Sequence, residues 1–140
     1  MVELVHRVRL FVYSFRDSRP DYLLLKRDQG VESIWTPLQG TIGFHEKFEG
    51  AILRELRRET GMGRPEEIID LKMPSAFDLL DQRIVEWNFA CRAEPGDPPL
   101  ALPEHWAEYR WSEFEAAFPV LEFEQDRAAI IRLHTMLLAG

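Results

Sequence analysis

The sequence predicts an α+β fold. Along the chain, strands precede and follow a central helix, and a second helix lies near the C-terminus. Three observations lead to this prediction. Several segments are rich in β-branched and aromatic residues, and two others carry apolar residues at the spacing of one helix face. The chain has 140 residues, of which 46% are hydrophobic, and this is enough for one core but hardly for two. We therefore expect a single domain over residues 1–140.

The predicted strands fall into two groups along the chain. Val5 to Phe15 is rich in strand-forming residues, and after a turn at Arg16 to Asp21 the run Tyr22 to Lys26 indicates a second, buried strand. The proline-rich segment Glu94 to Pro103 is predicted to be a loop. Three strands are expected after the central helix: Ile68–Leu71, Arg83–Arg92 and Tyr109–Trp111. A hairpin-like return is expected at Leu79–Gln82, before the second of these strands.

Two segments are predicted to be helices. Ala51 to Thr60 is rich in helix formers, its apolar residues lie on one face, and Gly61 ends it. Glu124 to Leu138 is the second predicted helix. Its inward stripe consists of Ile130, Leu133 and Leu137.

Two acidic residues of the central helix point the same way. A helix turns by about 100° per residue, so Glu55 and Glu59 lie about 40° apart at the edge of the apolar face. Like charges held this close repel one another unless a cation lies between them, and Mg²⁺ or Mn²⁺ prefers such clusters of carboxylate oxygens. Glu46, in the preceding loop, could supply another oxygen. The alternative is a solvated helix whose acids pair with its own arginines, Arg54, Arg57 and Arg58.

The segment from Gly40 to Met62 resembles the Nudix box, which reads Gly-x5-Glu-x7-Arg-Glu-apolar-x-Glu-Glu-x-Gly-apolar. The resemblance implies an α/β/α sandwich with a mixed β-sheet between helices. It also implies a pyrophosphohydrolase that binds Mg²⁺ or Mn²⁺ through Glu46, Glu55 and Glu59, with Arg54 orienting the catalytic Glu55. The matching positions are Gly40, Glu46, Arg54, Glu55, Leu56, Glu59, Gly61 and Met62.

One position departs from the box. Arg58 stands where the family has the first glutamate of its Glu-Glu pair, commonly a metal ligand. Because Arg58 lies one helical turn from Glu55, it could pair with that carboxylate or occupy the charge position of one metal ion. Three outcomes stay open: fewer metal ions with activity kept, weakened activity, or a nucleotide-binding or regulatory module of the same fold without turnover.

A second segment, Leu102 to Trp111 (LPEHWAEYRW), resembles a segment of two Nudix branches. One branch hydrolyses dinucleoside tetraphosphates, and the other hydrolyses dATP and dihydroneopterin triphosphate. The resemblance implies that Glu104 is a further metal ligand or the base that activates water. No pair among the four histidines has metal-ligand spacing within a helix, so a histidine zinc site is not expected.

The substrate signals conflict. Trp35-Thr36-Pro37 leads into the loop Gly40–Gly43, the glycine loop, and resembles a segment of the dinucleoside tetraphosphate branch. Ile84 to Cys91 and Asp126 to Ile130 look more like the dATP and pterin branch. The resemblance therefore implies cleavage of a phosphoanhydride bond in a nucleoside polyphosphate-type substrate by metal-activated water, without choosing the substrate. The candidate substrate-binding residues are Arg27, Trp35, Arg58 and Tyr109.

Composition limits the partners. The formal net charge of -7 and the absence of a basic run argue against binding a large nucleic acid, which needs cationic patches. A small phosphorylated substrate stays compatible with this charge, because local arginines and bound metal can reverse the sign of one cleft. Cys91 is the only cysteine, and no apolar stretch is long enough to span a bilayer, so we expect a cytoplasmic protein without a membrane partner. The sequence leaves a homodimer open.

Overall fold

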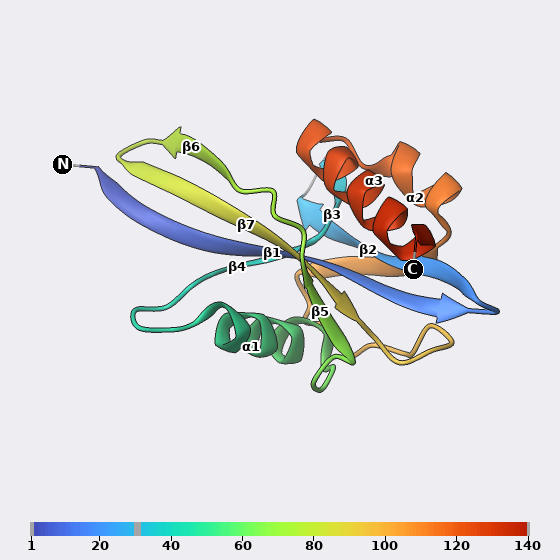
Figure 1. Ribbon diagram of the computed structural model, residues 1–140. Helices are drawn as coiled ribbons and strands as arrows, with labels where there is room; N and C mark the ends of the chain where they lie inside the picture. The colour runs from blue at the N-terminus through green and yellow to red at the C-terminus, as the bar shows by residue number, and fades with distance from the viewer. Residues whose placement is uncertain (1, 30–31, 140) are drawn as a thin grey trace.

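The computed structural model describes residues 2–29 and 32–139 (Figure 1). Within these residues, eight strands form one sheet and three helices pack against it, and none of the helices is long and apolar enough to cross a bilayer. The elements in chain order are β1 (Glu3–Arg16), β2 (Arg19–Gln29), β3 (Glu32–Thr36), β4 (Leu38–Thr41), α1 (Phe48–Thr60), β5 (Glu67–Asp70), β6 (Ser75–Leu79), β7 (Gln82–Arg92), β8 (Trp106–Ser112), α2 (Phe114–Val120) and α3 (Glu124–Ala139).

The sheet is mixed, because its central strands β1 and β7 run parallel while its other described strand pairs are antiparallel. The pairing of β1 with β7 extends from Glu3 beside Gln82 to Tyr13 beside Arg92. The opposite edge of β1 is shared, since its middle, Arg7–Leu10, pairs with β4 and its end, Tyr13–Arg16, pairs with β2. The sheet therefore forks between β4 and β2.

Helices cover both faces of the sheet, with α1 on one face and α2 and α3 on the other (Figure 1). Alternate residues of β1 point to opposite faces, as the pleat of a strand requires. Val8, Leu10 and Val12 join the core beneath α1, whereas Phe11 and Tyr13 join the core beneath α3. This arrangement confirms the predicted α/β/α sandwich with a mixed sheet between helices.

The predicted helices and strands are present, and the largest extensions beyond the predicted ranges are in β2 and β8. β2 begins at Arg19 and β8 begins at Trp106, and the two strands pair with each other over Tyr22–Arg27. Cross-strand hydrogen bonds thus extend both strands beyond the apolar runs that periodicity detects. The turn predicted at Arg16–Asp21 is correspondingly shorter, because Asp17 and Ser18, with φ of 52° and 67°, form a two-residue hairpin turn.

Four elements were not predicted: β3, β4, β6 and α2. Trp35 and Thr36, predicted to lead into the glycine loop, belong to β3 and pair with β2. The pairing of β6 with β7 confirms the return around Leu79–Gln82. The helix α2 is short and contains Pro119, so its sequence carries a weak helix signal.

Cys91 lies in the core beneath α1. Burial raises the pKa of its thiol to about 12, so the thiol stays protonated at neutral pH. Cys91 therefore packs as a small apolar residue.

Candidate active site

Helix α1 carries the candidate carboxylates and ends where the sequence predicts. Gly61 has a φ of 74°, and its backbone N–H donates a hydrogen bond to the carbonyl of Arg57 at 3.0 Å. A left-handed residue in this position ends a helix, and glycine adopts it without strain. A Cβ at Gly61 would also lie 3.2 Å from the Cβ of Ala101, so the helix end packs closely on the loop before β8.

Glu55 is completely buried and is neutralised by its own helix. The Nη2 atom of Arg58 donates to both carboxylate oxygens of Glu55 at 2.7 Å, and Nη1 of Arg54 donates to Oε1 at 2.5 Å. The carboxyl group lies against Gly40 of β4, where a Cβ would overlap with its carbon and oxygen atoms. Gly40 is therefore required for the approach of Glu55 to the sheet.

Glu59 is 8% exposed and has different partners. Its Oε2 atom accepts a hydrogen bond from the indole Nε1 of Trp106 at 2.7 Å and lies 2.7 Å from Nε2 of His105. Its Oε1 atom has a longer ion-pair contact of 3.6 Å with Nε of Arg58. The spacing of the histidines predicted no metal-binding role for His105, but the structure places it directly against Glu59, a predicted metal ligand.

Glu46 is tied to α1 by Arg54. The guanidinium of Arg54 donates to both oxygens of Glu46, from Nε at 2.9 Å and from Nη2 at 2.8 Å. The backbone N–H of Gly43 donates to Glu46 at 2.8 Å. The Arg54 contact first, and the Gly43 contact second, lower the pKa of Glu46 to about 2. Arg54 also donates to the carbonyl of Thr41, so it joins the end of β4, Glu46 and Glu55.

A cavity of about 520 Å³ lies at the fork of the sheet, beside these acids. It contains one buried carboxylate, Glu59, together with three guanidinium groups, so its lining carries more positive than negative charge. The structure brings the predicted residues Arg27, Arg58, Glu59 and Gly40 together here. The residues that line it are Arg7, Arg27, Gln39, Gly40, Thr41, Arg58, Glu59 and His105.

Apart from Glu46, Arg54, Glu55 and Gly61, described above, three more predicted residues do not line this cavity. Glu104 is exposed on the loop before β8, and no hydrogen bond or ion pair joins it to the part of the chain that the structure describes. Tyr109 packs against the core beneath α1, and its hydroxyl lies 3.4 Å from the backbone nitrogen of Leu100. Trp35 packs against the core beneath α3, with the guanidinium of Arg110 4.7 Å from its ring centroid.

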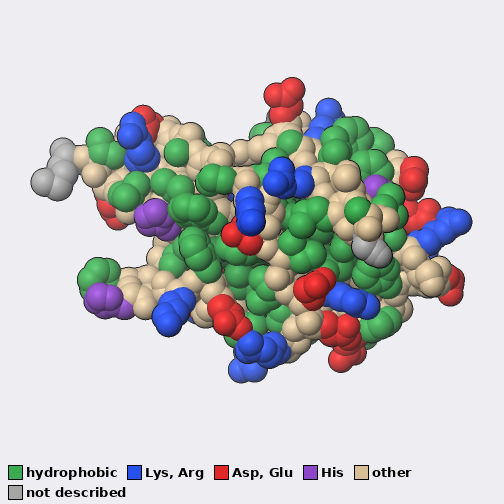
Figure 2. All heavy atoms as spheres, viewed as in Figure 1, with side chains coloured by type: hydrophobic (Ala, Val, Ile, Leu, Met, Phe, Trp, Pro, Cys, Tyr) green, Lys and Arg blue, Asp and Glu red, His purple; other side chains and the backbone are tan. Residues whose placement is uncertain are grey.

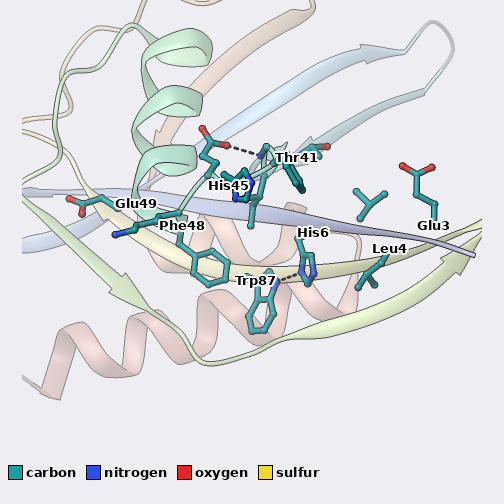
Figure 3. Close-up of a pocket in the computed structure, with 14 residues that line it drawn as sticks. Glu3, Leu4, His6, Thr41, His45, Phe48, Glu49 and Trp87 are labelled. Atoms are coloured by element: carbon teal, nitrogen blue, oxygen red, sulfur yellow. Dashed lines mark hydrogen bonds between the residues drawn. The ribbon is translucent and has the colours of Figure 1, made fainter.

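A larger groove of about 1010 Å³ adjoins the cavity at Thr41. Figure 2 shows the surface hollowed between the N-terminal end of the sheet and the loop that precedes α1. Aromatic rings form its floor: Phe48 lies edge-on to Trp87, and the indole N–H of Trp87 donates to Nδ1 of His6 at 3.2 Å (Figure 3). The groove is thus more apolar than the cavity.

The acidic residues offer a divalent cation fewer open ligands than the sequence predicted. Both oxygens of Glu46 and both oxygens of Glu55 accept hydrogen bonds from guanidinium groups, whereas Oε1 of Glu59 has only its long contact with Arg58. Over residues 2–29 and 32–139, no three histidine, cysteine or acidic side chains are grouped to hold a metal ion. Oxygen donors of this kind suit Mg²⁺ or Mn²⁺. Glu59 fits such an ion best, because its carboxylate also lines the cavity.

Comparisons with known proteins agree with this fold. A model of the NUDIX domain matches residues 5–134. The dihydroneopterin triphosphate pyrophosphohydrolase of E. coli is 17% identical, with a TM-score of 0.74 over 96% of both chains. An Ap4A hydrolase of C. elegans is 16% identical, with a TM-score of 0.73 over 97% of this chain and 99% of that chain. The NUDIX domain of Shewanella oneidensis NrtR, complexed with ADP ribose, is 17% identical, with a TM-score of 0.75 over 98% and 90%.

A search of curated proteins finds no match. The TM-scores show that these solved structures share the fold of this chain, and at such low identities they show the fold alone. The family model covers most of the chain. Together these findings confirm the resemblance drawn from Gly40–Met62 and support a pyrophosphohydrolase. The chain belongs to the Nudix family.

Proposed function

We propose that this protein cleaves a phosphoanhydride bond of a nucleoside polyphosphate-type substrate. The candidates are a deoxynucleoside triphosphate, dihydroneopterin triphosphate and a dinucleoside tetraphosphate. The observation that carries the proposal is the cavity in which Glu59 lies among three arginines. Guanidinium groups suit phosphate oxygens, and a buried carboxylate between them attracts a divalent cation.

The contacts of the remaining residues support individual roles. Arg54 holds Glu46 and Glu55 through hydrogen bonds, so it would keep both acids in position. Arg58 would neutralise Glu55 and add positive charge to the cavity. Arg27, whose guanidinium lies 4.9 Å from the ring centroid of Trp106, would bind phosphate from the β2 side.

Glu59, with Glu55 beside it, would hold Mg²⁺ or Mn²⁺. When bound, such an ion neutralises phosphate oxygens and lowers the pKa of water. Glu104, on the loop next to His105, is proposed as the general base or a further metal ligand, and its carboxylate is exposed. Trp35 and Tyr109 stay candidates for contacts with the nucleobase or pterin ring of the substrate. The net charge of -7 favours a small substrate over a nucleic acid.

We also propose a cytoplasmic location. The single cysteine is buried and protonated, so no feature of the described chain calls for an oxidising compartment. This proposal would fail if the native protein were recovered outside the cytoplasm in fractionated cells.

One observation favours a different function. Arg58 donates to both oxygens of Glu55, so a carboxylate expected to bind metal is already neutralised by the chain. On this second hypothesis the protein binds a nucleotide without turning it over, as a binding or regulatory module. The NUDIX domain structure with bound ADP ribose shows that the fold can hold such a ligand.

Product analysis separates the two hypotheses. The protein would be incubated with Mg²⁺, with Mn²⁺ or with EDTA, and with a panel of nucleoside triphosphates, dihydroneopterin triphosphate, dinucleoside polyphosphates and ADP-ribose. Chromatography would then identify the products and therefore the bond that is cleaved. Turnover that needs the metal and is lost in Glu59→Gln would support the hydrolase. Nucleotide binding without turnover in any condition would support the binding module.

A further inference from the structure

We infer that Arg7 is a phosphate-binding residue of the cavity and that the buried carboxylate of Glu86 positions it. This inference rests on the proposed function, because it assigns a role within the same cavity. Neither residue belongs to the segment Gly40–Met62. The two residues are far apart in the sequence and meet only because β1 and β7 run side by side.

The strand register explains how Arg7 reaches the cavity. Arg7 lies beside Glu86 of β7 on one side and beside Thr41 of β4 on the other. Directly paired residues of neighbouring strands point to the same face of a sheet. Thr41 lines the cavity together with Arg7. The cavity therefore extends from Glu59 of α1 across the end of β4 onto the central strand β1.

The carboxylate of Glu86 accepts a hydrogen bond from the guanidinium of Arg7. Nη1 of Arg7 lies 3.5 Å from Oε2 of Glu86, and their side chains are 25% and 3% exposed. The same oxygen of Glu86 lies 3.6 Å from Nε of Arg9, which is buried. Arg9 in turn pairs with Asp126 at the start of α3 and donates to Asn88 at 3.3 Å. A chain of buried polar contacts thus anchors Arg7 to β7 and α3.

The charges of this cluster require Arg7. Arg9 contributes one buried positive charge, while Glu86 and Asp126 contribute two buried negative charges. Arg7 supplies the missing positive charge and is the member of the four with the most exposed side chain. Buried ion clusters add little net stability, so their geometry is a better clue to their role.

Arg7 also keeps donors free for a ligand. A guanidinium has five N–H donors, and Arg7 uses one of them in a long contact with Glu86. Among the described residues, no other side chain accepts a hydrogen bond from Arg7. A guanidinium with unused donors, which lines the same cavity as Arg27 and Arg58, suits a chain of phosphate groups.

Titration calorimetry with inorganic tripolyphosphate tests the role of Arg7. The titration is made in EDTA, so that only the cations of the protein bind the probe. We expect Arg7→Met to weaken binding by about tenfold or more, and Arg7→Lys by about threefold, because lysine keeps the charge but not the planar fork. The matched control is Arg83→Met, which removes an exposed arginine of β7 that pairs with Asp78 outside the cavity.

Unchanged binding in a folded Arg7→Met or Arg7→Lys variant, or no binding by the wild-type chain, would overturn the inference. The test is independent of turnover. Binding lost in Arg7→Met, with no hydrolysis of any substrate by the wild type, would keep the phosphate site and refute the hydrolase. Hydrolysis by the wild type with equal binding in Arg7→Met would refute the inference and keep the hydrolase.

The sign of the Glu86→Gln effect tests positioning. If Glu86 acted only as a counter-charge, its removal would leave the cavity more positive and tripolyphosphate would bind more tightly. If Glu86 positions Arg7, binding weakens by about threefold in spite of the added positive charge. With a hydrolysed substrate, the expected change is a higher KM at nearly unchanged kcat. Tighter binding, or equal binding in a folded variant, would reject the positioning role.

Discussion

Glu55 and Glu59 lie one turn apart on α1, and both are buried, but their partners differ. Glu55 accepts hydrogen bonds from two guanidinium groups of its own helix. Glu59 accepts a hydrogen bond from the indole of Trp106 and contacts the imidazole of His105. The charge of Glu55 is therefore compensated by fixed cations, whereas Oε1 of Glu59 has only its long contact with Arg58 and stays open to a cation in the cavity. Two carboxylates of one motif can thus serve different purposes.

The largest expected effect concerns Glu59. Glu59→Gln keeps the shape of the side chain but removes its charge, and we expect it to lower metal-dependent turnover by more than about a hundredfold. Steady-state rates with Mg²⁺ and Mn²⁺ measure this effect. The control is Glu66→Gln, an exposed acid that pairs with Arg92 outside the cavity. Equal activity in Glu59→Gln would remove the metal role from this residue and erase its contrast with Glu55.

The next effect concerns the space that Glu55 occupies. A Cβ at Gly40 would overlap with the Glu55 carboxyl group, so Gly40→Ala must displace either the helix or β4. We expect the free energy of unfolding to fall by about 2–3 kcal/mol, as for other overpacked cores. Urea denaturation measures it. Gly63→Ala is the control, because nothing lies within 4 Å of the added Cβ there, and equal losses in both variants would contradict the tight approach.

Reversing the charge of Arg58 sharpens the comparison, because it would remove a cation that neutralises Glu55. Arg58→Glu removes the Nη2 group that donates to both oxygens of Glu55 and adds a carboxylate. We expect the affinity for Mn²⁺ to rise by about tenfold, measured by calorimetry. Arg57→Glu, the exposed neighbour on the same helix, controls for a general charge effect. A fall in both metal affinity and turnover would instead make Arg58 part of the working site.

The smallest expected effect concerns Asp21, a buried carboxylate outside the cavity, and the pH dependence of the protein's stability. Burial, followed by the influence of Asp97, raises the pKa of Asp21 from 3.8 to about 6. Because the folded state then binds the proton more tightly than the unfolded state, stability falls as the pH rises from about 4 to about 6, and the penalty is complete above that range. Asp21→Asn removes the penalty. Its melting temperature should exceed that of the wild type by a few degrees at pH 8 and by less at pH 5.

If the difference in melting temperature between Asp21→Asn and the wild type were equal at the two pH values, the raised pKa would be wrong. Asp78→Asn is the matched control. Arg83 lowers the pKa of Asp78, and both side chains are exposed, so little change with pH is expected above the acidic range.

Local patterns were enough to predict the centre of the candidate site. The helical period places Glu55 and Glu59 on one edge of α1, and Gly61 marks the end of that helix. The pairing of Arg58 with Glu55 also follows from their separation of one turn. These features depend on residues within one or two helical turns of each other. The sequence therefore contains them directly.

Long-range contacts could not be predicted in the same way. Arg7, Gln39 and Thr41 enter the cavity through the register of β1 with β4, and the hydrogen bond from Trp106 to Glu59 spans 47 positions of the chain. No periodic pattern encodes which strand pairs with which, or at which offset. The role of Glu104 stays a prediction, because it depends on how its loop meets a substrate.

The parallel pairing of β1 with β7 has a consequence for folding kinetics. Arg7 and Glu86 are separated by 79 positions, so the central pair of strands forms only after a long stretch of chain has been closed into a loop. Non-local pairings of this kind slow folding, since the entropy of closing the loop is lost before the contacts stabilise it. Until β7 pairs with β1, the backbone N–H and C=O groups along this edge of β1 stay unpaired and can bind to strands of other chains. We therefore expect refolding yield to fall steeply with protein concentration.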